Sequence, residues 1–165
     1  MAFADTLSNL LSLRWLRSPA ARTRAWEDRF QAGVEALRRE DLAGAERAFA
    51  QALNEAEGFP AGDVRLTVSL DNLAGVLRME GKNADAEPLC TRTLAIKERL
   101  FGPESPNVAS TLKDLAEIHR QLGDFERAQG YNRRAMAILQ KAIGPDFEEL
   151  EESLRRSPVL RDDGE

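Results

Sequence analysis

The sequence contains one histidine and one cysteine, His119 and Cys90, the side chains best suited to catalysis or metal binding. A histidine can act as a general base or ligate zinc, and a cysteine thiolate is a nucleophile or a metal ligand. A zinc site needs three or four such ligands, and a nucleophilic cysteine needs a base at a recognisable spacing. Neither pattern is present in the sequence, so we predict that both side chains pack in the core.

The acidic run from Glu148 to Glu152 is the next candidate, because carboxylates bind divalent cations. The run lacks the alternating oxygen ligands and the turn glycine of a calcium loop, so a solvated helix face is the favoured interpretation. The glycines are spread along the chain and form no phosphate-binding loop. We therefore predict no catalytic residue, no cofactor and no metal site, and we expect that the protein is not an enzyme.

The composition is that of a globular protein, with 165 residues, of which 31% are charged and 42% hydrophobic. The apolar runs are only a few residues long, so no membrane span is predicted. A single cysteine forms no intramolecular disulfide, and we expect a reducing compartment, the cytoplasm. The net charge of −5 resides in residues 146–165, and the chain lacks the basic face that is typical of nucleic-acid binding.

An internal repeat organises the chain. A shift of 42 residues places Leu70 to Ala74 on Leu112 to Ala116, and Gly102-Pro103 on Gly144-Pro145. A weaker upstream copy, shifted by 41 residues, has Gly33 at the place of Ala74. A period of this length is typical of a solenoid, in which each unit is a helical hairpin that buries its apolar face against its neighbours.

Each unit is predicted to contain two helices with matching start and stop signals. The apolar residues follow the helical period, and no segment alternates with the period of a strand. Capping and terminating residues indicate helices from about 64 to 80 and from about 84 to 101. The signals are Asp63 as cap and Gly81 as stop, Asn83 as cap and Gly102-Pro103 as stop, then Ser105-Pro106, Gly123, Asp124 and Gly144-Pro145 in the next unit.

These patterns resemble the tetratricopeptide repeat family over about residues 25–145. Small residues that allow close helix approach recur at Gly33, Ala74 and Ala116 in the first helices, and at Ala45, Ala86 and Ala128 in the second. The period, the Asn-Leu-Ala segment and the Gly-Pro linkers resemble the kinesin light chain type, which also occurs in bacterial proteins unrelated to motors. The sequence departs from the family at Cys90 and Asn132, where a large aromatic residue is usual, and at Thr93, where alanine is usual.

The resemblance implies an all-α fold, an α-solenoid of three helical hairpins over residues 19–145, with units at about 25–60, 64–103 and 106–145. Residues 146–157 are expected to form a C-terminal capping helix, because an open solenoid end needs a polar cover, and residues 158–165 an acidic tail. Residues 1–18 are expected to hold an amphipathic helix. Docking on its own domain, binding to a partner, peripheral membrane contact through residues 3–17 and a transit peptide all remain open for it.

The resemblance also implies a concave surface, lined by the first helices, that binds a protein or peptide. In related repeats an asparagine at the place of Asn72 hydrogen-bonds the backbone of an extended ligand; a solvated asparagine is the alternative. The outward positions that we assign to peptide binding, transferred by register, are Phe30, Val34, Arg38, Asp71, Asn72, Arg78, Met79, Lys113, Glu117 and Arg120.

The character of the ligand follows from these side chains. Their mixed charges favour a ligand that carries both signs, and Phe30, Val34 and Met79 supply an apolar patch for a helix or an aromatic anchor. The carboxylate clamp of chaperone-type repeats is rejected, because its places hold Phe30, Val34, Asn72, Ser110 and Asp114, of which only Asn72 agrees.

Two functions remain open at the level of the sequence. The favoured one is a cytoplasmic adaptor that binds a peptide or helix on the concave face of the solenoid. The alternative is a structural self-assembly unit that homo-oligomerises through the solenoid ends or the N-terminal helix.

Overall fold

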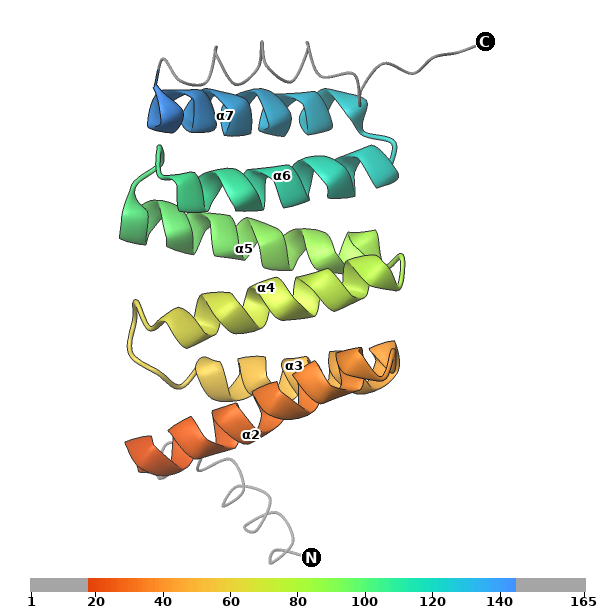
Figure 1. Cartoon of the computed structure of the whole chain (residues 1–165), viewed down its shortest axis with the longest axis vertical. Coiled ribbons are helices and arrows are strands. Elements are labelled where there is room, and N and C mark those ends of the chain that lie inside the picture. The colour runs from red at the N-terminus through yellow and green to blue at the C-terminus, as the bar shows by residue number, and fades with distance from the viewer. Residues whose placement is uncertain (1–17, 145–165) are drawn as a thin grey trace, which may run out of the picture.

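Six helices make up the part of the chain that the computed structural model describes, residues 18–144. They are α2 (Pro19–Arg38), α3 (Leu42–Ala56), α4 (Val64–Met79), α5 (Asn83–Phe101), α6 (Pro106–Gln121) and α7 (Phe125–Ile143). Figure 1 shows them stacked from α2 to α7, and each contacts the next along the chain. The predicted all-α solenoid of helical hairpins is confirmed for these residues. The helices predicted at 3–17 and 146–157 and the tail at 158–165 lie outside them.

Helix starts follow the capping residues of the sequence. The Asp63 carboxylate accepts a hydrogen bond from the Arg65 N–H at 2.9 Å, and the Asp124 carboxylate accepts one from the Arg127 N–H at 3.1 Å. Ser105 caps α6 ahead of a proline at the first helical position. Because each cap satisfies a backbone donor that has no partner within its helix, these residues fix where the hairpins turn.

One cap differs from the prediction. α5 begins at Asn83 itself, with Lys82 at the N-cap position and no side-chain hydrogen bond to the helix start. The reason is the short connection: Gly81 has a φ of 76°, and the next N–H, of Lys82, already donates to the Leu77 carbonyl at 2.8 Å. The turn is therefore complete one residue earlier than predicted. The Lys82 ammonium lies 2.7 Å from Glu46.

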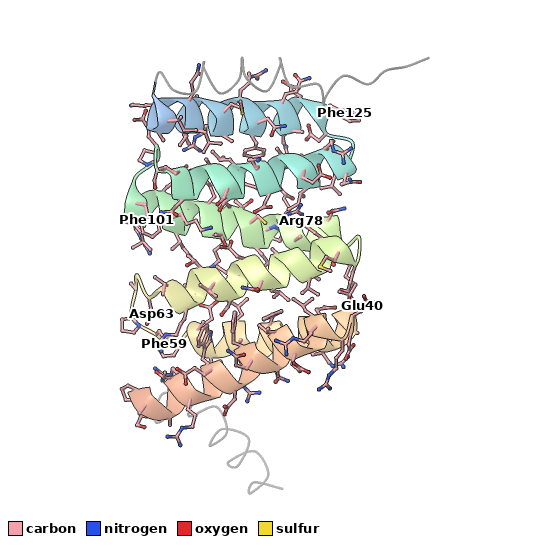
Figure 2. The ribbon with its side chains drawn as sticks, viewed as in Figure 1. Glu40, Phe59, Asp63, Arg78, Phe101 and Phe125 are labelled. Carbon is pink, nitrogen blue, oxygen red and sulfur yellow. The ribbon has the colours of Figure 1, made fainter. Side chains whose placement is uncertain are left out.

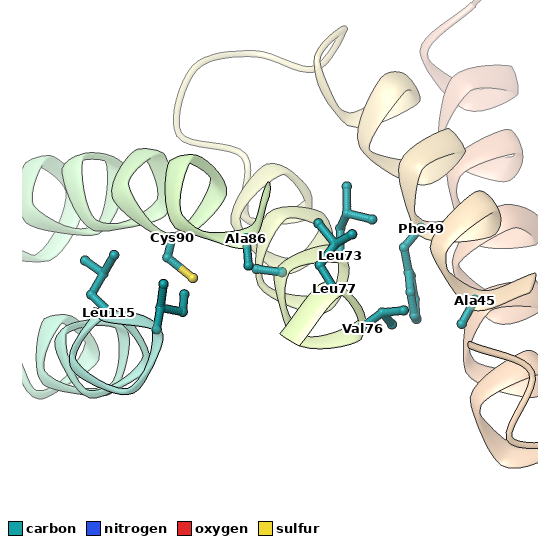
Figure 3. Packing of buried hydrophobic residues seen from close by; sticks show 10 residues of the cluster. Ala45, Phe49, Leu73, Val76, Leu77, Ala86, Cys90 and Leu115 are labelled. Atoms are coloured by element: carbon teal, nitrogen blue, oxygen red, sulfur yellow. The ribbon is translucent and has the colours of Figure 1, made fainter. Parts of the chain in front are cut away.

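The hydrophobic core lies between successive helices in two clusters of buried residues, and Figure 3 shows the larger one. One cluster centres on Phe49, Leu73, Leu77 and Leu115, and a second, which includes Leu112, joins α6 to α7. The small residues predicted to allow close helix approach are all buried: Gly33, Ala45, Ala74, Ala86, Ala116 and Ala128.

Gly33 illustrates why a small residue is needed at a helix crossing. A Cβ atom at this position would lie 2.6 Å from the Phe49 ring. Phe49 is fully buried, with its ring edge-on to Phe30 at a centroid distance of 5.5 Å, and Phe30 stacks on Trp26 at 5.0 Å. A side chain at residue 33 would therefore displace an aromatic cluster that holds α2 against α3.

Glu40 occupies the place that Gly81 and Gly123 hold in the other units, and it adopts a φ of 59° (Figure 2). The left-handed conformation costs a residue with a side chain roughly 1–2 kcal/mol, whereas glycine loses about 0.5–1 kcal/mol of backbone entropy. We therefore expect Glu40→Gly to raise the free energy of unfolding by about 0.5–1 kcal/mol in urea denaturation followed by circular dichroism.

The matched control is Glu126→Gly, the same substitution in the first turn of α7, where the backbone is right-handed. This change should lower the free energy of unfolding, because glycine disfavours the helix. Equal losses from both substitutions would show that the φ of Glu40 carries no strain.

Candidate interaction surface

His119 lies in the core between α5, α6 and α7. The residue is 2% exposed, and its ring stacks on Tyr131 at a centroid distance of 5.3 Å. The imidazole Nε2 is 3.5 Å from a Glu87 carboxylate oxygen, and Nδ1 is 3.8 Å from a carboxylate oxygen of Asp124. These contacts join three helices, which is the packing role predicted for this side chain.

Cys90 is also a core residue, as predicted. Its side chain packs in the cluster that contains Ala86 and Leu115 (Figure 3). Burial raises the pKa of the Cys90 thiol to about 12, and the nearby carboxylate of Asp114 adds to the effect. The thiol is therefore protonated at neutral pH, and the thiolate that nucleophilic chemistry requires is scarce.

A hollow of about 580 Å³ lies between the first helices of the second and third hairpins, α4 and α6. It brings together three of the predicted binding residues, Arg78, Met79 and Glu117; Arg78 is labelled in Figure 2. The other residues that line it are Gly75, Gly81, Asn83 and Gln121. Its size is within the range of sites that hold a ligand side chain or a small molecule.

The charges around this hollow are paired with one another. The Arg78 guanidinium donates a hydrogen bond to the Asp114 carboxylate across the two helices. Glu117 accepts hydrogen bonds from Arg120 at 2.6 and 2.8 Å and from Gln121 at 2.8 Å. The bond from Arg120, followed by that from Gln121, lowers the pKa of the Glu117 carboxyl to about 2. Glu117 is therefore ionised and neutralised by its neighbours at any physiological pH.

Two further predicted residues of the second hairpin differ in whether their side-chain oxygens already have a partner. Asn72 is half-buried, and its side-chain N–H donates to the Val68 carbonyl at 2.7 Å. Asp71 lies 2.9 Å from the Lys97 ammonium, which also donates to Thr111 at 2.9 Å. Asp71 thus joins α4 to α5 and α6, whereas within residues 18–144 nothing donates a hydrogen bond to the Asn72 carbonyl oxygen.

Lys113, the remaining predicted residue of the third hairpin, is exposed on α6. Within residues 18–144 no carboxylate forms an ion pair with it.

Most of the predicted residues of the first hairpin pack against the hydrophobic core. Phe30 and Val34 are half-buried and pack against the main hydrophobic cluster. Arg38 is exposed and lies 3.0 Å from Glu35. Met79, which the sequence grouped with Phe30 and Val34 in one apolar patch, is 65% exposed and lines the hollow.

Two residues of the hollow, Gly75 and Gln121, are outward positions of α4 and α6 by the same register, although they are not among the residues assigned to peptide binding. Sequence reasoning missed Gly81 and Asn83. Gly81 lies in the connection between α4 and α5 and Asn83 begins α5, and only the folded chain brings them to the hollow. A smaller hollow, of about 440 Å³, lies between α2 and α3 and is lined by Ala25, Asp28, Arg29, Ala32, Ala48 and Gln51.

Between residues 18 and 144 no helix is both long enough and apolar enough to cross a membrane. Over the same range no three side chains of the histidine, cysteine, aspartate and glutamate types gather in a way that would hold a metal ion.

Comparison with known proteins gives a family match. The family model of the tetratricopeptide repeat matches residues 65–141. A comparison with curated proteins gave no match. The family model does not separate the kinesin light chain type from other repeats, so that type stays a prediction.

Several solved structures are similar to the chain. The TPR domain of Arabidopsis FLU is 21% identical with a TM-score of 0.64, covering 73% of this chain and 98% of its own. The N-terminal domain of stress-induced protein-1 from C. elegans is 15% identical with a TM-score of 0.60, covering 82% of this chain and 98% of its own. BtubC (BKLC) from P. vanneervenii is 27% identical with a TM-score of 0.57, covering 74% of this chain and 56% of its own. With its repeat, its stacked hairpins and its match to the family model over residues 65–141, the chain has the fold of a tetratricopeptide repeat protein.

Proposed function

We propose that the protein is an adaptor that binds a peptide or a helix of another protein across α4 and α6, with the hollow between them at the centre of the site. Tetratricopeptide folds are protein–protein interaction modules and are generally not enzymes. The observation that carries the proposal is the hollow itself, because it unites Arg78, Met79 and Glu117 from two successive first helices.

Asn72 supports the same surface. It lies on the face of α4 that carries Gly75 and Met79, since residues three and four positions apart share one side of a helix. Its side-chain carbonyl is able to accept a hydrogen bond from the backbone of a ligand. An extended peptide that fills the hollow would therefore meet a group that accepts a hydrogen bond from its main chain.

The test uses a phage-displayed library of random peptides selected on the whole protein. A selected peptide is synthesised, and its Kd is measured by fluorescence anisotropy for the wild type and for the variants Asn72→Ala and Arg120→Ala. Each variant should weaken binding by about tenfold, because Asn72 loses its acceptor and Arg120 leaves the Glu117 carboxylate unpaired beside the bound ligand. The melting temperature should not change, since the Arg120 side chain is 56% exposed.

The matched controls are Asn132→Ala and Arg133→Ala, which make the same changes at exposed places on α7 away from the hollow. These controls should bind the peptide as the wild type does. Equal affinities for Asn72→Ala, Arg120→Ala and the wild type would show that this surface is not the binding site.

Self-assembly is the alternative, and the two ends of the described stack differ in their support for it. In the first hairpin Arg29 and Ala32 occupy the places of Leu70 and Leu73, which are buried in the second hairpin. The face that carries Arg29 is therefore compatible with exposure to solvent. The last hairpin instead exposes large apolar side chains: Leu122, Phe125, Met136 and Ile143. Assembly would therefore use the α7 end, and a monomeric mass in light scattering of the whole chain would contradict it.

A further inference from the structure

We infer that the hollow between α4 and α6 selects an uncharged apolar side chain, such as leucine, phenylalanine or methionine, and rejects charged ones. This inference rests on the proposed function, since it specifies the ligand of that same site. It replaces the expectation from the sequence that the ligand carries both positive and negative charges.

The space for such a side chain comes from Gly75. A Cβ atom at this position would meet nothing within 4 Å, so the packing of the fold does not require a glycine here, in contrast to Gly33. The repeat places Val34 and Glu117 at the same position in the other two hairpins, so both neighbouring units carry a side chain there. Glycine is disfavoured inside a helix. At residue 75 the missing side chain leaves the floor of the hollow, its base between α4 and α6, open.

The charges around this floor explain the selectivity. Arg78 is held by Asp114, and Glu117 is held by Arg120 and Gln121. A charged side chain that entered the hollow would lose its hydration and meet no unpaired opposite charge among the residues that line it. An apolar side chain loses no such hydration and removes its own surface from water.

Met79 supplies the apolar contact. Its side chain is 65% exposed at the edge of the hollow, although large apolar side chains in this fold mostly face the core. A thioether on a flexible stem adapts to aliphatic and aromatic partners alike. The hollow therefore accepts several apolar side chains, and it selects for the absence of charge more strictly than for a particular shape.

The test uses short blocked peptides of serine, alanine and glycine with one central guest residue: leucine, phenylalanine, aspartate, lysine or glycine. Binding to the whole isotope-labelled protein is followed by nuclear magnetic resonance. The leucine and phenylalanine peptides should shift the amide signals of α4 and α6 and bind at least about tenfold more tightly than the other three.

Two variants locate the binding. Gly75→Leu fills the hollow from its floor and should weaken the leucine peptide by about tenfold or more, and Met79→Ala, which leaves the core untouched, should also weaken it. The matched control is Gly130→Leu on α7, where a Cβ atom likewise meets nothing within 4 Å, and it should bind as the wild type does.

The outcomes separate this inference from the proposed function. If the aspartate or lysine peptide binds as tightly as the leucine peptide, or if no peptide binds at millimolar concentration, the inference is wrong. It is also wrong if Gly75→Leu and Met79→Ala leave the affinity unchanged while Asn72→Ala lowers it, and the adaptor proposal then stands. If none of these three variants changes the binding of a phage-selected peptide, the proposed function itself is wrong.

Discussion

Replacing Phe49 with alanine should lower the free energy of unfolding by about 3–5 kcal/mol. Phe49 is fully buried, and its ring fills the crossing between α2 and α3 against Gly33 and Phe30. Alanine leaves a cavity that the neighbouring helices cannot close, because Gly33 has no side chain to fill it. Urea denaturation followed by circular dichroism gives the change in free energy.

Phe125→Ala is the control, since it deletes the same ring at a place where the side chain is 64% exposed. This substitution should change the free energy of unfolding by less than about 0.5 kcal/mol. If both variants lost the same stability, the aromatic cluster around Phe49 would not be a main support of the fold.

Replacing Leu112 with alanine should cost about 2–5 kcal/mol, because this side chain is fully buried in the cluster that joins α6 to α7. The loss should be local. In a solenoid each hairpin contacts only its neighbours, so a defect in one unit acts mainly on that unit. Amide hydrogen exchange should therefore speed up in α6 and α7 and change little in α2 and α3.

Phe49→Ala is the complementary experiment. It should give faster amide hydrogen exchange in α2 and α3. Leu122→Ala, at a leucine that is 46% exposed, controls for the loss of a leucine as such and should alter neither pattern. Uniformly faster exchange along all six described helices in the Leu112 variant would show that the stack unfolds as one cooperative unit.

The first hairpin departs from the repeat in several ways that have one physical meaning. Glu40 replaces the turn glycine, and Arg29 and Ala32 replace leucines that are buried in the next unit. The Arg29 guanidinium lies 3.6 Å from Glu55 and donates to Gln51. Among residues 18–144 no earlier hairpin packs against the first one, so its sequence is free to diverge where the inner units must pack.

The repeat, together with the family resemblance that its residues carry, was sufficient to predict the stacked helical hairpins. The spacing of small residues identified each helix crossing, because two helices approach closely only where side chains are absent, and Gly33, Ala74 and Ala116 are all buried. The caps at Asp63, Ser105 and Asp124 were predicted because they act on backbone groups only a few residues away. The cap at residue 83 was wrong by one position, which is the usual precision of a helix boundary.

The pairing of Arg78 with Asp114 was decided only by the tertiary structure, because it joins two helices. Glu117 instead pairs with Arg120 three residues along the same helix, which is a local pattern. Arg78 and Asp114 lie 36 residues apart, and side-chain rotamers select such partners from many nearby charges. Periodicity determines which face a residue occupies. Whether a charge such as that of Arg78 remains available also depends on contacts between helices, which no local pattern encodes.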